Sequence, residues 1–393
     1  MDSVLNTFIE IRNDPYEWIR NWKEKNQDKK VVAVGVYHFP EELVHAAGIL
    51  PFGLQEGNEP IVEGYSYIYP AYCGYSRSLI DMGAKGNMKI FDGMIITDIC
   101  IQLVQAQRKY LRNFPQPHLY LFQPSLDLSK DRNKPDLMVD FAKLRGQIED
   151  IAGKPVEDEA IRNSIKIYNK NRALLRKLHD IRHNNPGVIR ARDMQAVVMA
   201  SMVMPKEEHS ALLEKLISEL ESAQPVQREG IPVFLSGHLC HAPKIEILDM
   251  IESMGGIVVD DDLHTGYRYY AKDVREDGDP MDALIDRFRQ IEPDCISRMH
   301  PKNRWDEYLL RKSRESGAKG VIILQPKYCE HQNFAYLYQQ KTLAEGGMDH
   351  ILIESEHEMI SLEQTRTKVQ AFVEMIQAKS TDAVRRHNNV KQS

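Results

Sequence analysis

Hydrophobic residues recur along the chain in two patterns: short continuous runs, and longer stretches spaced at three or four residues. The continuous runs are typical of buried parallel strands, and in the first part of the chain they lie at 31–36, 93–97 and 118–122. Helical spacing dominates elsewhere, beginning with an amphipathic region at 1–30 that Pro15 interrupts. Strands that alternate with helices predict a mostly parallel sheet covered on both faces.

The strand pattern almost disappears between 134 and 227, where helical spacing returns at 137–151, 161–181 and 207–222. Further strands are predicted at 232–236, 257–259, 320–324 and 350–353. We therefore expect an α/β protein with two Rossmann-like lobes joined by a helical segment. The expected boundaries are 1–130 for the N-terminal helix and first lobe, 131–229 for the helical middle segment, and 230–393 for the second lobe with a C-terminal helix.

Composition excludes some classes of function. The 393 residues carry 51 Lys and Arg against 57 Asp and Glu, a formal net charge of −6, with no long block of one sign. Nucleic acid is therefore not an expected partner. The longest apolar runs are shorter than the ~20 residues that span a bilayer, so we expect a cytoplasmic protein without a membrane segment.

The five cysteines are the most informative residues. They are odd in number, widely spaced and lack a CxxC pair, which argues against a disulfide framework and a structural zinc site. Cys100, Cys240 and Cys329 each follow a predicted strand, and Cys73 lies in a loop that enters a predicted helix. Because carboxyl ends of parallel strands share one edge, these thiols could surround an iron–sulfur cluster. The alternative is core packing as small hydrophobic residues, which is our interpretation of Cys295.

Four ordered blocks resemble the family of 2-hydroxyacyl-CoA dehydratases and ATP-dependent benzoyl-CoA reductases. They are FPEELVHAAGILPFGL (39–54), EGYSYIYPAYCGYSRSLIDMG (63–83), FDGMIITDIC (91–100) and GVIILQPKYCEHQ (320–332). A further stretch at 255–284, GGIVVDDDLHTGYRYY followed by DGDPMDAL, is most similar to the smaller cluster-bearing catalytic subunit of benzoyl-CoA reductase.

The resemblance implies that Cys73, Cys100 and Cys329 each give a thiolate to one [4Fe-4S] cluster, in which one iron has no cysteine ligand. It does not make Cys240 a ligand, and we place this thiol next to the cluster as pocket lining. The chain departs from the family at one position: the second block often continues Cys-Asp, whereas Ile101 follows Cys100 here.

The function implied by the resemblance is that of an iron–sulfur subunit of a benzoyl-CoA reductase. Such an oxidoreductase, driven by ATP and ferredoxin, dearomatises benzoyl-CoA to a cyclic dienoyl-CoA in anaerobic aromatic degradation. Two alternatives stay open: a subunit of a 2-hydroxyacyl-CoA dehydratase, which eliminates water through a ketyl radical, and a non-catalytic electron-transfer or structural subunit.

The expected partners follow from the same resemblance. The sequence has no GxxxxGK[ST] phosphate loop, so ATP hydrolysis would lie on another chain. We expect a homologous larger catalytic subunit, ATP-hydrolysing electron-activating subunits, ferredoxin as donor to the complex, and an acyl-CoA substrate.

Histidines near predicted strand ends are the candidate proton donors. His238 and His331 rank first because both lie beside cysteines, and the others are His38, His241 and His264. Each histidine alone is more typical of a surface or hydrogen-bonding group than of a proton donor.

Other charged residues allow two interpretations. The run Asp260, Asp261 and Asp262 resembles a metal-binding sequence, although three carboxylates after a strand more often cap the next segment or face solvent. Arg77 and Arg268 are candidates to orient the thioester or the coenzyme phosphates, with a surface salt bridge as the alternative. Arg77 lies in the first cysteine block and is expected next to the cluster.

Overall fold

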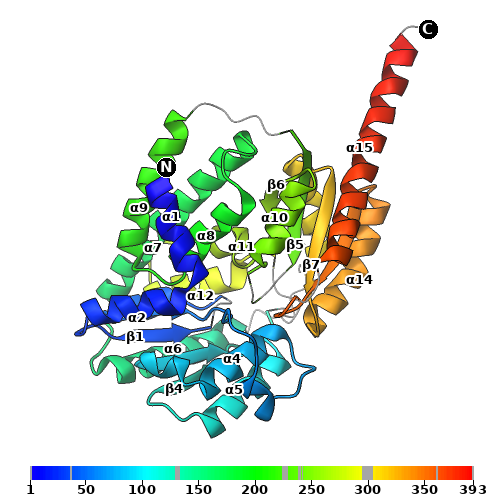
Figure 1. The fold of residues 1–393 in the computed structure, drawn as a ribbon. Coiled ribbons are helices and arrows are strands. Elements are labelled where there is room, and N and C mark those ends of the chain that lie inside the picture. The colour runs from blue at the N-terminus through cyan, green and yellow to red at the C-terminus, as the bar shows by residue number, and fades with distance from the viewer. Residues whose placement is uncertain are drawn as a thin grey trace.

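A computed structural model describes residues 2–35, 38–128, 133–223, 229–237, 240, 242–293, 304–359 and 362–391 (Figure 1). Of the residues discussed above, His238, His241 and Cys295 lie outside these ranges.

Four parallel strands form the first sheet, in the order β2-β1-β3-β4. They are β1 (Val31–Val34), β2 (Leu50–Gly53), β3 (Gly93–Thr97) and β4 (Leu119–Phe122). Every residue of β1, β2 and β3 is buried, as continuous apolar runs require in a sheet covered on both faces. The sequence analysis did not predict β2, because Pro51 and Gly53 weaken its strand pattern; an edge position tolerates both residues.

The second sheet repeats this arrangement in the order β6-β5-β7-β8. Its strands are β5 (Ile231–Gly237), β6 (Gly256–Asp261), β7 (Gly320–Pro326) and β8 (Asp349–Ser355), again all parallel. The predicted α/β class with two Rossmann-like lobes is therefore confirmed. In both sheets the first and third strands are neighbours, which is the place where loops gather in doubly wound folds.

Helices surround both sheets and fill the space between them (Figure 1). Those of the first lobe are α1 (Asp2–Asn13), α2 (Pro15–Lys25), α3 (Glu41–Ala46), α4 (Gly74–Ala84) and α5 (Ile101–Asn113), with short 3₁₀ turns η1 (Glu63–Ser66) and η2 (Asn87–Ile90). The middle helices are α6 (Asn133–Ala152), α7 (Asp158–Asn184), α8 (Ala191–Ser201) and α9 (Lys206–Ser222). The second lobe adds α10 (Ile245–Ser253), α11 (Tyr267–Tyr270), α12 (Pro280–Gln290), α13 (Trp305–Glu315), α14 (Glu330–Glu345) and α15 (Glu363–Lys391).

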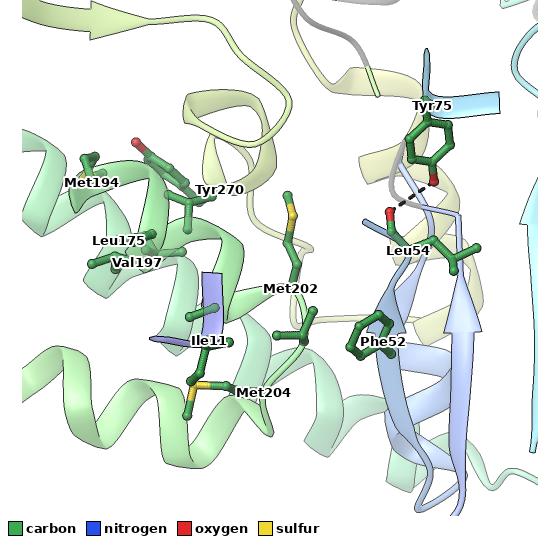
Figure 2. Packing of buried hydrophobic residues seen from close by; sticks show 14 of the residues in the cluster. Ile11, Phe52, Leu54, Tyr75, Leu175, Met194, Val197, Met202, Met204 and Tyr270 are labelled. Carbon is green, nitrogen blue, oxygen red and sulfur yellow. Dashed lines mark hydrogen bonds between the residues drawn. The ribbon is translucent and has the colours of Figure 1, made fainter. Parts of the chain in front are cut away.

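One hydrophobic cluster is shared by the first sheet, the middle helices and the second sheet. Figure 2 shows Met202, which follows α8, between strand residues Phe52 and Leu54 on one side and Val197 on the other. The Met202 carbonyl also accepts a hydrogen bond from the N–H of Gly53 at 2.8 Å. The domain boundaries predicted near residues 130 and 230 stay a prediction, because the segments before and after each boundary pack into this common core.

The three aspartates after Val259 are buried, in contrast to the expectation that they cap a segment or face solvent. Asp260 and Asp261 end β6, and Asp262 has no exposed surface. Asp262 accepts hydrogen bonds from Ser236 Oγ at 3.1 Å and Trp305 Nε1 at 2.6 Å. Carboxylates can be buried here because α7, β5 and α13 supply donors to them.

Helix α7 is attached to β6 through a buried ionic contact. His179 Nε2 lies 2.8 Å from Asp260 Oδ1, and Arg182 donates to the Val258 carbonyl at 2.6 Å. Burial by itself lowers the pKa of His179, but the hydrogen bond and the charge of Asp260 outweigh it, and the pKa is raised. The protonated form of His179 is therefore the one that stabilises the junction between the middle helices and the second lobe.

Gly237 ends β5 with φ at +107°, and a Cβ atom there would lie 2.0 Å from the Leu324 carbonyl oxygen. We expect Gly237→Ala to lower the free energy of unfolding by about 3 kcal/mol, from the combined backbone strain and steric clash. Gly317→Ala is the matched control, because Gly317 has φ at +72° but open space around it, so it should cost about 1 kcal/mol. Urea titration measures both, and equal losses would contradict the clash.

Raising the pH should weaken the His179–Asp260 contact. A raised folded pKa gives stability that is complete below the unfolded value of about 6.5 and is lost as the pH rises through the folded value. We expect His179→Gln to lower the free energy of unfolding by about 2 kcal/mol at about pH 5, with the difference from wild type shrinking toward about pH 9. His183→Gln, exposed on the same helix, is the control. A difference that does not change with pH would rule out the imidazolium.

Candidate functional site

Three cysteines occupy the same structural position, the residue directly before a helix. Cys73 is the N-cap of α4, Cys100 that of α5 and Cys329 that of α14. Two of these helices follow the parallel strands β3 and β7, and α4 follows the loop after η1. The positive end of a helix dipole favours a thiolate, so all three positions suit an anionic sulfur ligand.

One amide side chain joins the loops that carry these cysteines. Gln102, in the first turn of α5, accepts a hydrogen bond from the Cys73 N–H at 2.8 Å. It also donates to the carbonyl of Tyr328 at 2.7 Å, the residue before Cys329. Because Gln102 lies two residues after Cys100, this single group ties together three segments from both lobes.

The turn at Tyr328 is conformationally unusual. Its φ of +66° lies in the left-handed region, which bulky residues seldom adopt. The bond from Gln102 to the Tyr328 carbonyl fixes this turn, which directs Cys329 into the start of α14. Backbone conformations of this kind cluster at binding sites.

Residues 356–358, which follow β8 and which we call the clasp, connect the second lobe to the loop before Cys73. His357 Nδ1 lies 2.6 Å from Glu56 Oε1, and its Nε2 lies 2.9 Å from the Glu59 carbonyl oxygen. Glu358 accepts from the N–H of Ile61 at 2.9 Å.

The clasp also touches the residue after Cys73. A Cβ atom on Gly74 would lie 2.9 Å from the Cβ of His357, so the two segments approach as closely as a glycine allows. The position of Cys73 relative to the second lobe is thus held by main-chain packing as well as by hydrogen bonds.

Arg77 is buried, and its guanidinium makes its contacts with groups of the protein itself. It donates to the Tyr72 carbonyl and to the Tyr65 hydroxyl, both at 2.8 Å, and forms an ion pair with Glu356 of the clasp. Because Tyr72 precedes Cys73, these contacts place Arg77 against the first cysteine loop, and its position next to a cluster stays a prediction. Its guanidinium positions this loop and is not presented to a ligand.

Burial governs the chemistry of the thiols. Desolvation raises the pKa of Cys73, and hydrogen bonds with Ser76 only partly oppose it. Burial also raises the pKa of Tyr75, with smaller contributions from Cys240 and Cys73. Cys240 therefore lies near Tyr75, in the first turn of α4, and its role as pocket lining stays a prediction. Because burial outweighs the groups that favour the thiolate, the pKa of Cys73 lies above its ordinary value.

The histidines predicted as proton donors are in different surroundings. His331 lies in the first turn of α14, two residues after Cys329, and burial lowers its pKa, so it is neutral near pH 7. His38 and His264 face each other with ring centroids 5.9 Å apart. Both line a small internal cavity, of about 20 Å³, together with Glu41.

The sequence analysis missed a buried charged group next to this cavity. Lys206 Nζ lies 3.2 Å from Glu41 Oε2, and the Tyr269 hydroxyl is 3.0 Å from both oxygens of that carboxylate. Desolvation lowers the pKa of Lys206. Glu41 and Lys206 each begin a helix and look like ordinary first-turn and surface residues, so only their burial reveals them.

Arg268 does not have the exposure that a role in binding coenzyme phosphates requires. It is almost fully buried, its guanidinium carbon lies 4.3 Å from the ring centroid of Trp305, and it donates to the Pro293 carbonyl at 2.9 Å. Asp262 lies 3.6 Å away as its counter-charge. Arg268 therefore holds the loop after β6 against α13.

Three cysteine thiolates are the type of donor that an iron–sulfur cluster uses. In the described residues no three His, Cys, Asp or Glu side chains come together to hold one metal ion. A four-iron cluster needs less convergence, because each thiolate binds a different iron atom. Cys73, Cys100 and Cys329, each directly before a helix, are the residues that would hold such a cluster.

Comparison with known proteins gives the family. The family model for the 2-hydroxyglutaryl-CoA dehydratase D-component matches residues 36–376. The chain belongs to this family. It is 28% identical to a benzoyl-CoA reductase subunit of Thauera aromatica, over 79% of this chain and 81% of the relative.

Two dehydratase subunits align with a larger share of this chain than the benzoyl-CoA reductase subunit does. The (R)-phenyllactyl-CoA dehydratase beta subunit of Clostridium sporogenes is 26% identical over 95% of this chain and 99% of its own length. The beta subunit of the (R)-2-hydroxyglutaryl-CoA dehydratase of Acidaminococcus fermentans is 28% identical over 96% and 100%. The predicted family is thus confirmed, and its members named here are enzyme subunits. None of the described helices has the length and apolarity to cross a membrane.

Removing the Gln102 amide should loosen the cysteine loops. Gln102→Leu loses both main-chain hydrogen bonds, so we expect a loss of about 2 kcal/mol in the free energy of unfolding. The Cys73 amide should exchange its hydrogen roughly tenfold faster, as measured by mass spectrometry of the peptide that contains it. Gln105→Leu, half-buried on the same helix, is the control. An unchanged exchange rate at Cys73 would show that Gln102 does not hold the loop.

Proposed function

We propose that this chain is the iron–sulfur subunit of an ATP-dependent benzoyl-CoA reductase. In this proposal Cys73, Cys100 and Cys329 hold a [4Fe-4S] cluster with one iron free of cysteine. The observation that carries it is the Gln102 amide, which joins all three cysteine loops across the two lobes. If these thiols only lined a pocket, the three loops would not need to be joined by one amide. The shared contact with Gln102 therefore supports a common ligand.

A bound cluster would supply electrons at low potential to the thioester of the substrate. The chain's own residues have other tasks. The helix N-termini of α4, α5 and α14 stabilise negative charge at the sulfur ligands. Gln102 and the clasp hold the loops in position, and the packed interior around Tyr75 limits access of water.

We propose His331 and His238 as the proton donors. His331 lies two residues from Cys329, and as a neutral imidazole near pH 7 it would act as a relay that accepts a proton at its free ring nitrogen and then passes one on to the acyl group. His238 follows β5 in the sequence, next to the segment that carries Cys240.

The proposed function needs partner subunits. ATP-hydrolysing subunits that receive electrons from ferredoxin are required because this sequence has no phosphate loop. A larger homologous subunit completes the proposed complex.

Dehydration of a 2-hydroxyacyl-CoA is the second candidate function. It is favoured by coverage: the dehydratase beta subunits align with 95% and 96% of this chain, against 79% for the benzoyl-CoA reductase subunit. A subunit that only transfers electrons to a partner would share the cluster site and lack the substrate.

An anaerobic assay of the complex tests the proposal. With benzoyl-CoA, reduced ferredoxin and ATP we expect a cyclic dienoyl-CoA, with ATP consumed in fixed proportion to product. Conversion of a 2-hydroxyacyl-CoA to an enoyl-CoA with ATP needed only in catalytic amounts would instead establish the dehydratase. Acyl-CoA binding by the partner alone would identify an electron-transfer subunit.

Iron content tests the ligand assignment separately. We expect Cys73→Ser and Cys329→Ser to lose most of the iron and sulfide and the absorbance of the cluster, because a thiolate ligand is removed. Cys240→Ser is the matched control and should retain them. Equal loss in all three variants would show that the ligand set is wrong, whatever the reaction.

A further inference from the structure

A cavity of about 1080 Å³ lies outside the site described above, between α11, α12 and α13. Its volume is at the upper end of the range for small-molecule pockets. The lining contains six cationic side chains: Lys272, Arg289, Arg304, Arg311, Lys312 and Arg314. Such a concentration of positive charge contrasts with the formal charge of −6 for the whole chain, and it favours an anionic ligand.

Carboxylates in the cavity wall neutralise only part of this charge. Glu307 pairs with Arg304 at 2.9 Å, and Glu315 pairs with Arg311 at 3.2 Å and with Lys312 at 2.9 Å. The lining has one further carboxylate, Glu292.

Three cations in the cavity have no ion-pair partner in the described part of the chain. Arg314, in α13, donates to the Gly346 carbonyl at 2.7 Å. The other two are Lys272, after α11, and Arg289, at the end of α12. The Nε of Arg289 is buried and makes no hydrogen bond with any described residue. A buried guanidinium nitrogen without an acceptor is costly, and a bound anion would supply that acceptor.

The cavity lies on the side of the second sheet that is used by the cysteines. Tyr267, in its wall, follows the carboxyl end of β6, and its N–H donates to Asp261 at 2.9 Å. Cys329 follows the carboxyl end of β7, and β5 lies between β6 and β7. Because the three strands are parallel, their carboxyl ends share one edge. An extended ligand along this edge can reach from the cavity toward the cysteine loops.

We propose that this cavity binds the phosphorylated nucleotide end of an acyl-coenzyme A. The inference rests on the proposed function, which requires an acyl-CoA, and it adds where on this chain the coenzyme is held. Phosphate groups match the guanidinium and ammonium groups of Arg289 and Lys272 in charge and hydrogen bonding. A concave cavity of this volume is typical of a small-molecule site, whereas protein partners bind flatter surfaces. The cavity therefore favours a nucleotide over a protein partner. ATP has the same chemistry, so the experiment must separate the two nucleotides.

The test compares the complex that contains wild-type chain with one that contains Lys272→Gln/Arg289→Gln. Neither residue pairs with a described carboxylate, so the substitutions break no described ion pair. We expect the Kd for coenzyme A and benzoyl-CoA, from calorimetry, to rise about tenfold or more. The KM for the acyl-CoA should rise similarly with kcat unchanged. Lys25→Gln/Lys166→Gln removes two exposed charges elsewhere and should change neither constant.

Benzoyl-pantetheine, which lacks the nucleotide, should bind equally well to both forms of the complex. An unchanged Kd for coenzyme A in the double variant would overturn the assignment, as would an equal loss for benzoyl-pantetheine. Displacement of coenzyme A by an equal concentration of ATP would also overturn it. If wild-type complex binds no acyl-CoA, the proposed function itself fails, and this outcome is distinct from a change limited to the variant.

Discussion

The placement of the candidate site depends on two hydrogen bonds between the Gln102 side chain and main-chain groups of both lobes. A side chain that binds main chain fixes the path of a loop, whereas a contact between two side chains leaves both free to rotate. Gln102 does this for the loops of Cys73 and Cys329 while it is attached to the helix that Cys100 begins. The clasp at 356–358 adds a second connection between the same lobes. Cysteine loops from distant segments are thus held in position by contacts within the protein.

Charged residues have two separate tasks in this fold. Burying an ion costs several kcal/mol unless a partner and hydrogen bonds compensate it. Asp262 meets Arg268 and Trp305 at a junction between segments far apart in sequence, and this pairing is satisfied in only one packing of those segments. Lys272 and Arg289 line the cavity beyond the end of β6 and have no ion-pair partner among the described residues. In the proposal above, their charge attracts the phosphates of the coenzyme.

Much of the fold could be predicted from the sequence, because the signals are local. Seven of the eight strands lie where continuous apolar runs predicted them, and Pro15 separates α1 from α2. The exceptions have local causes. Strand β2 contains Pro51 and Gly53, and α8 is buried on nearly every side, so its apolar run has no helical period. The cysteine blocks likewise lie within short segments, which is why the family could be identified without a structure.

The sequence by itself determined the α/β class, the strand ends that carry the thiols and the family. Only the tertiary structure decided that Asp260–Asp262 are buried, that Arg268 faces Trp305, and that Gln102 reaches Tyr328, 226 residues away. The physical reason is that periodicity and turn preferences depend on neighbouring residues. A buried ion pair or a hydrogen bond between loops exists only when packing removes water from both partners and brings them together.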